Sequence, residues 1–84
     1  MKVGDNLEKA IQYTLGRLEG FLKFKKIGKS ELAKLWKKTD AYVYRRFSGE
    51  VELSLTDILE LIQILDIPKD EAKDIFFGYE LRNA

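Results

Sequence analysis

The side chains best suited to chemistry in this chain lie in segment 29–49, which contains both basic and aromatic residues. An arginine can form two hydrogen bonds with guanine O6 and N7, and a tyrosine can pack on a thymine methyl group or donate to a phosphate. The segment carries such groups close together, as Tyr42, Tyr44, Arg45 and Arg46. These residue types at this spacing indicate recognition of a nucleic acid.

The amino-acid composition argues against catalysis. The 84 residues include no cysteine and no histidine. This excludes disulfides, thiolate metal sites and cysteine nucleophiles, and it removes the commonest general base and metal ligand. We therefore expect a protein that is not an enzyme and that uses no cofactor, no metal and no small-molecule substrate.

Length and hydropathy predict one domain in the cytoplasm. A chain of this size forms a single domain with one modest core, and its 45% hydrophobic and 35% charged residues are typical of a folded globular protein. No apolar run approaches the roughly 18 residues of a membrane span. The first residues lack the apolar stretch of a secretion signal, so we expect no contact with a membrane.

Charge is divided between the two halves of the chain. Residues 1–46 contain twelve Lys or Arg and five Asp or Glu, a net charge of +7, whereas residues 47–84 contain three and nine, a net charge of −6. The whole-chain charge of +1 hides this dipole. One half suits a polyanion and the other is repelled by it; ordinary solvated surface charge is the other interpretation.

Helical spacing of apolar residues predicts a long N-terminal helix and two C-terminal helices. The first should run over about 6–24. The C-terminal pair should lie within about 56–77, with Pro68 in the first turn of the last helix and Gly78 ending it.

Segment 30–48 is typical of two short helices joined by a tight turn. Ser30 should cap the first helix and Thr39 the second. In the second helix Val43 and Phe47 are four residues apart and should face the core. Because an α-helix fits the major groove of DNA, a helix held across another in this way could enter that groove.

Three motifs, in order, make residues 29–77 similar to a known family. They are Ser-Glu-Leu-Ala from residue 30, Thr-Asp-Ala-Tyr-Val-Tyr-Arg-Arg-Phe-Ser-Gly from residue 39, and Leu-Ser-Leu-Thr-Asp-Ile-Leu-Glu-Leu-Ile-Gln-Ile-Leu-Asp-Ile-Pro from residue 53, followed by Asp-Ile-Phe-Phe from residue 74. The chain resembles the lambda-repressor-like, Cro/CI-type helix-turn-helix family, and within it the small Cro-like proteins of phages from Gram-positive bacteria.

The resemblance implies an all-α fold, a compact five-helix lambda-repressor-like DNA-binding domain over residues 1–84 with a helix-turn-helix at helices two and three. It implies a transcriptional regulator that binds double-stranded DNA sequence-specifically and represses by occupying its operator in the nucleoid of a bacterial host. The protein would act as a homodimer, at least on DNA, since two helices about 34 Å apart must reach one face of the duplex.

The resemblance also assigns roles by position in the motifs. The front and outer face of the third helix imply base reading by Asp40, Ala41, Tyr42, Tyr44 and Arg45. The opening of the second helix, the turn and the third helix imply phosphate contacts by Lys29, Ser30, Lys38, Thr39 and Arg46.

Other interpretations of these residues stay open. Arg45 could be a surface or phosphate-contacting arginine, Arg46 could pair with an acid of the fourth helix, and the two tyrosines could pack on the second helix. Asp40 could merely favour the helix dipole. An apolar cluster near the C-terminus could either close the core or form a dimer contact; it consists of Ile75, Phe76, Phe77, Tyr79 and Leu81.

Two departures from the family pattern favour a second function. Lys37 stands at the turn position that the family usually fills with glycine. Glu50 and Glu52 follow the third helix, where the family often holds backbone phosphates. The alternative is a protein-interaction module on the same fold, an antirepressor or an assembly adaptor, whose acidic helices bind a basic partner instead of DNA.

Overall fold

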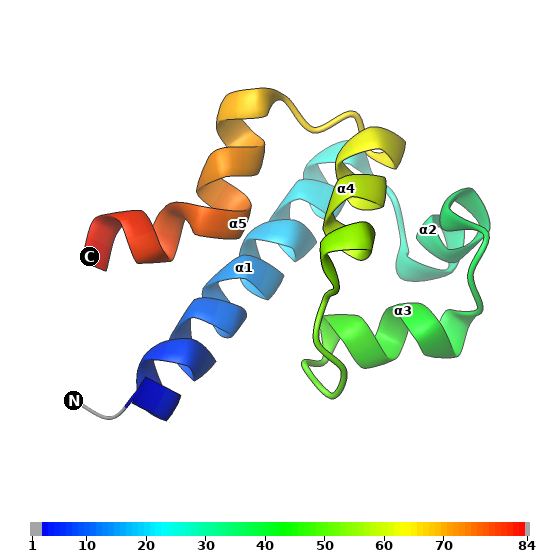
Figure 1. The fold of residues 1–84 in the computed structure, drawn as a ribbon. Helices are drawn as coiled ribbons and strands as arrows, with labels where there is room; N and C mark the ends of the chain where they lie inside the picture. The colour runs from blue at the N-terminus through cyan, green and yellow to red at the C-terminus, as the bar shows by residue number, and fades with distance from the viewer. Residues whose placement is uncertain (1–2, 84) are drawn as a thin grey trace.

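Five α-helices joined by short connections make up residues 3–83 of the computed structural model (Figure 1). The structure describes the backbone of these residues and the side chains of residues 6–79. The described backbone contains no strand, which confirms the all-α prediction, and no helix in it is both long enough and apolar enough to cross a membrane. The helices are α1 (Val3–Lys25), α2 (Lys29–Trp36), α3 (Asp40–Phe47), α4 (Leu55–Ile64) and α5 (Lys69–Asn83).

Local capping chemistry sets the starts of the middle helices. Thr39 caps α3 as predicted, because its hydroxyl accepts a backbone hydrogen bond at 3.1 Å. Ser54 caps α4 in a capping box: its hydroxyl accepts from the Asp57 N–H, and the Asp57 carboxylate accepts from the Ser54 N–H. The predicted cap at Ser30 is wrong. Gly28 is the N-cap of α2, without a side-chain hydrogen bond, and Ser30 lies in the first turn of the helix.

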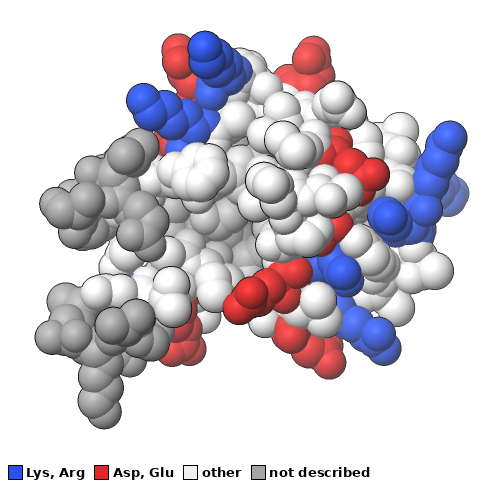
Figure 2. All heavy atoms as spheres, viewed as in Figure 1, with Lys and Arg blue, Asp and Glu red and all other residues white. Residues whose placement is uncertain are grey.

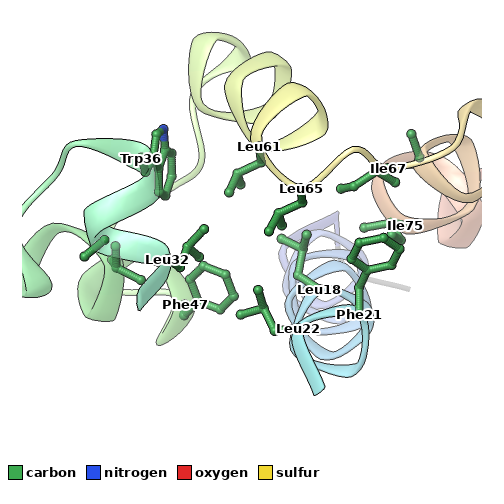
Figure 3. Close-up of a cluster of buried hydrophobic side chains, with 13 residues drawn as sticks. Leu18, Phe21, Leu22, Leu32, Trp36, Phe47, Leu61, Leu65, Ile67 and Ile75 are labelled. Atoms are coloured by element: carbon green, nitrogen blue, oxygen red, sulfur yellow. The ribbon is translucent and has the colours of Figure 1, made fainter. Parts of the chain in front are cut away.

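The core lies where the second half of α1 meets the other helices (Figure 3). α1 packs mainly on α5, while α2 packs on α3 and α4, and apolar side chains fill the seam between these two groups. Val43 and Phe47 are buried, as predicted, and Trp36 is buried too. The other buried apolar side chains include Leu18 and Leu22 of α1, Leu32 of α2, Leu61 of α4 and Ile75 of α5.

Gly78 lies inside α5, so the prediction that it ends the helix is wrong. The glycine is buried, and a Cβ atom there would lie 2.5 Å from Asp74 Oδ1 and 3.1 Å from the Tyr13 hydroxyl. Tyr13 donates a hydrogen bond to Asp74 at 3.0 Å, and Arg17 Nη2 lies 2.7 Å from the same carboxylate. Asp74 and Tyr13 therefore occupy the space that a side chain at residue 78 would need, and α5 continues past the glycine with a change of direction that Figure 1 shows.

The substitution Gly78→Ala should destabilise the protein although alanine favours a helix by about 1 kcal/mol over glycine. The new methyl group would displace the Asp74 carboxylate from Tyr13, and we expect urea denaturation to show a loss of about 1–2 kcal/mol in the free energy of unfolding. Gly16→Ala is the matched control in α1, because a Cβ atom there meets nothing within 4 Å; it should stabilise the protein by about 0.5–1 kcal/mol. Equal effects of the two substitutions would contradict this account of α5.

Candidate nucleic-acid interface

The connection between α2 and α3 is a tight turn built on a lysine. Lys37 has φ 59° and ψ 41°, the left-handed conformation that favours glycine. The Lys37 N–H donates to the Lys34 carbonyl at 3.2 Å, and the Lys38 N–H donates to the Ala33 carbonyl at 2.9 Å. These bonds close the last turn of α2. A lysine in this conformation costs about 1 kcal/mol, and it places a positive charge at the turn.

Two buried side chains decide which side of α3 faces outward. Val43 is 0% exposed and Phe47 is 6% exposed. Because they lie one turn apart, the opposite side of this eight-residue helix faces solvent. We call this exposed side the outer face of α3; it consists of Asp40, Ala41, Tyr44 and Arg45.

A buried carboxylate joins α3 to α4. Asp57 is 1% exposed, and it accepts hydrogen bonds from the Tyr42 hydroxyl and from Arg46 Nε, the latter at 3.1 Å. The Arg46 guanidinium also stacks on the Tyr42 ring, 3.4 Å from the ring centroid, and Tyr42 packs edge-on against Trp36. We call these four residues the Asp57 junction.

Hydrogen bonding sets the charge state of the Asp57 junction. Burial by itself raises the pKa of Asp57, but hydrogen bonds from Tyr42, Ser54 and Arg46 outweigh burial and hold the pKa below its ordinary value of 3.8. The hydrogen bond to Asp57 raises the pKa of Tyr42 above its ordinary value of 10.0, and burial acts in the same direction. At neutral pH the junction therefore combines a carboxylate, a neutral phenol and a guanidinium.

The junction turns two predicted DNA-contacting residues away from the outer face. Tyr42 is half-buried and its hydroxyl is held by Asp57. The Arg46 side chain is 17% exposed and pairs with the same carboxylate, which confirms the interpretation that it pairs with an acid of the fourth helix. Base reading by Tyr42 or phosphate binding by Arg46 would require the junction to open.

Sequence reasoning did not single out Asp57 itself. The Ser54-Leu55-Thr56-Asp57 pattern indicates a capping box, and the structure contains one. Nothing in the spacing indicates that the same carboxylate accepts from a tyrosine and an arginine of the preceding helix, because those contacts depend on how α3 and α4 pack.

The remaining predicted phosphate-contacting residues lie at the start of α2 and in the turn. Ser30 and Thr39 are exposed, and the Lys38 ammonium lies 4.9 Å from the centroid of the Tyr42 ring. The Lys29 ammonium is 2.8 Å from the Glu19 carboxylate and 5.5 Å from the centroid of the Tyr44 ring. Lys29 thus lies beside the outer face of α3, and a phosphate there would compete with Glu19 for it.

The predicted dimer-contact residues divide between core and surface. Ile75 is 1% exposed and closes the core. Phe76 and Tyr79 are half-buried, and the Tyr79 ring packs on that of Tyr13. Phe77 is 55% exposed, and the side chain of Leu81 lies outside the described residues.

The sign of the surface charge changes near the C-terminal end of α3. In Figure 2, basic side chains gather over α3 and the turn before it, and acidic side chains lie over the loop that follows. The exposed acids of this loop are Glu50 and Glu52. A polyanion is therefore attracted to the turn and repelled from the α3–α4 loop.

The substitution Asp57→Asn should lower the free energy of unfolding by about 2–3 kcal/mol at neutral pH. It removes the buried counter-charge of Arg46 and replaces an acceptor oxygen with a donor group. Urea denaturation measures the loss. Glu52→Gln removes an exposed carboxylate nearby and should change stability by no more than about 0.5 kcal/mol.

The pH dependence of stability gives a second readout of the Asp57 junction. The pKa of Asp57 is lower in the folded state than in the unfolded state. Its contribution to the free energy of unfolding is therefore present above pH 3.8, the ordinary pKa, and is lost as the pH falls through the folded-state pKa. The raised pKa of Tyr42 has the opposite consequence. Its contribution to the free energy of unfolding is present below pH 10.0, the ordinary pKa, and is lost as the pH rises through the folded-state pKa. Asp57→Asn should therefore flatten the acid side of the stability profile, and an unchanged acid profile would contradict the assignment.

No family model, curated protein or solved structure matches this chain. The interpretation of the interface therefore rests on its geometry and charge.

Proposed function

We propose that the protein is a sequence-specific DNA-binding regulator of transcription of the lambda-repressor-like type, a Cro-like repressor of a phage or prophage. α3 enters the major groove of double-stranded DNA with its outer face toward the bases. Arg45 pairs with guanine, while Asp40, Ala41 and Tyr44 contact neighbouring bases. The protein acts by occupancy in the cytoplasm of a bacterial host: once bound, it blocks polymerase.

The observation that carries this proposal is the uncovered outer face of α3. The Arg45 side chain is exposed and makes no hydrogen bond or salt bridge with any described residue. Burial of Val43 and the hydrogen bonds of the Asp57 junction fix the inner side of α3 against the rest of the protein. The Arg45 guanidinium therefore stays on the exposed side. Basic groups at the turn add affinity for any sequence through counterion release.

We further propose that two copies bind one operator, because one short helix contacts only a few base pairs. Of the predicted dimer-contact side chains within the described range, Phe77 is the one that is exposed. Selection from random duplex DNA tests the function and the symmetry together. Two half-sites about 10 base pairs apart should be enriched, and enrichment of no sequence would contradict the proposal.

A protein-interaction module is the second candidate function. Exposed Glu50 and Glu52 directly after α3 favour it, since carboxylates there repel phosphates and suit a basic protein partner. Salt dependence separates the two functions. Affinity for DNA should fall steeply with added salt through several phosphate contacts, whereas failure to bind any duplex at low salt would favour the interaction module.

Wild-type protein should bind the selected operator more tightly than a duplex in which the guanines are replaced. Replacing Arg45 with alanine should reduce this difference in binding free energy by about 1–3 kcal/mol. Fluorescence anisotropy with the two duplexes at one salt concentration measures this difference. Lys73→Ala is the matched control, because it removes one exposed positive charge from α5. If Arg45→Ala binds and discriminates as the control does, α3 does not read DNA in the proposed way.

A further inference from the structure

An apolar groove opens between the first half of α1, the α3–α4 loop and α5. Its volume is about 350 Å³, which is within the size range of ligand pockets, and Figure 2 shows an uncharged hollow in this part of the surface. Four exposed apolar side chains line it: Leu7 (55%), Ile11 (38%), Val51 (36%) and Phe77 (55%). Such clusters of exposed apolar side chains mark contact surfaces.

The groove exists because the seam between the two helix groups is only partly filled. Leu18 and Leu22 fill the seam at the second half of α1. Toward the N-terminal end of α1 the lining includes the short side chains of Ala10 and Thr14 and the glycine Gly49, which leave space between the larger apolar side chains. Part of the seam therefore stays open to solvent.

The exposed charges of the α3–α4 loop, which borders the groove, are acidic. Glu52 lines the groove and Glu50 is exposed two residues earlier, and neither forms a salt bridge with any described residue. The cation that lines the groove, Arg46, is already paired with Asp57. The groove thus suits an apolar group that carries positive charge around it.

This chain displays such a group at the far end of α1. Phe24 is 80% exposed, more than any other large apolar side chain in the described range. Lys23, Lys25 and Lys26 are its exposed neighbours in sequence. Phe24 follows Ile11 by thirteen positions along α1, which is about 20 Å, so Phe24 cannot reach the groove of its own chain.

We propose that the groove binds Phe24 of a second copy, with the neighbouring lysines of that copy beside Glu50 and Glu52. The contact joins two different surfaces, so it is head to tail. In a pair, the copy that inserts Phe24 keeps a free groove, and the copy that supplies the groove keeps a free Phe24. It leaves the outer face of α3 uncovered and lets copies line up in one orientation. The contact does not depend on DNA reading.

Sedimentation equilibrium of the whole chain without DNA tests the contact. The average mass of the wild type should rise with concentration between micromolar and millimolar, and less so at high salt. Phe24→Ser and Val51→Lys should each weaken association by about tenfold or more, the effect of losing a central aromatic or its pocket. The matched controls are Leu35→Ser and Leu59→Lys, which change exposed apolar residues outside the groove and should associate as the wild type does.

Mixing the two defective variants identifies the geometry. Phe24→Ser keeps an intact groove and Val51→Lys keeps an intact Phe24, so an equimolar mixture should form a one-to-one heterodimer and nothing larger. Circular dichroism verifies that each variant is folded, and Leu7→Lys is a second groove variant. A wild type that stays monomeric, a Phe24→Ser variant that associates as the wild type does, or a mixture that forms no heterodimer would each overturn the proposal, whatever the outcome of the DNA experiments.

Discussion

The buried carboxylate of Asp57 is the constraint on which the orientation of α3 depends. A charge removed from water costs several kcal/mol unless partners surround it. The Ser54 N–H supplies one hydrogen bond to Asp57, and both side-chain donors come from α3. Tyr42 and Arg46 are four residues apart, so they lie on one stripe of the helix beside the stripe of Val43 and Phe47. Rotation of α3 in either direction would expose the apolar stripe or strip the carboxylate of its donors. The outer face of α3 is therefore the side of the helix that carries neither the apolar stripe nor the donors to Asp57.

Features that depend on neighbours in sequence could be predicted. Thr39 caps α3 because a hydroxyl there reaches a backbone N–H one turn ahead. Val43 and Phe47 are buried because helical spacing places them on one side. These predictions needed no knowledge of what packs against the helix.

Features that depend on distant contacts could not be predicted. Glycine usually ends a helix, yet Gly78 lies inside one, where Tyr13 and Asp74 occupy the space that a side chain would need. The same limit applies to the candidate site. Tyr42 has the chemistry of a base-reading residue, and only the position of Asp57 in α4 shows that its hydroxyl is already used.

The Asp57 junction also connects the two surfaces to which we assign binding. Arg46 lines the apolar groove and at the same time stacks on Tyr42 of α3, while the outer face of α3 lies on the other side of the helix. Arg46 cannot leave Asp57 for a ligand in the groove without leaving a buried carboxylate underpaired, which is costly. An apolar group can therefore bind in the groove without breaking the ion pair between Arg46 and Asp57. The orientation of α3 is preserved while the groove is occupied. Two separate contacts on so small a chain are compatible because the charged group between them is neutralised within the fold.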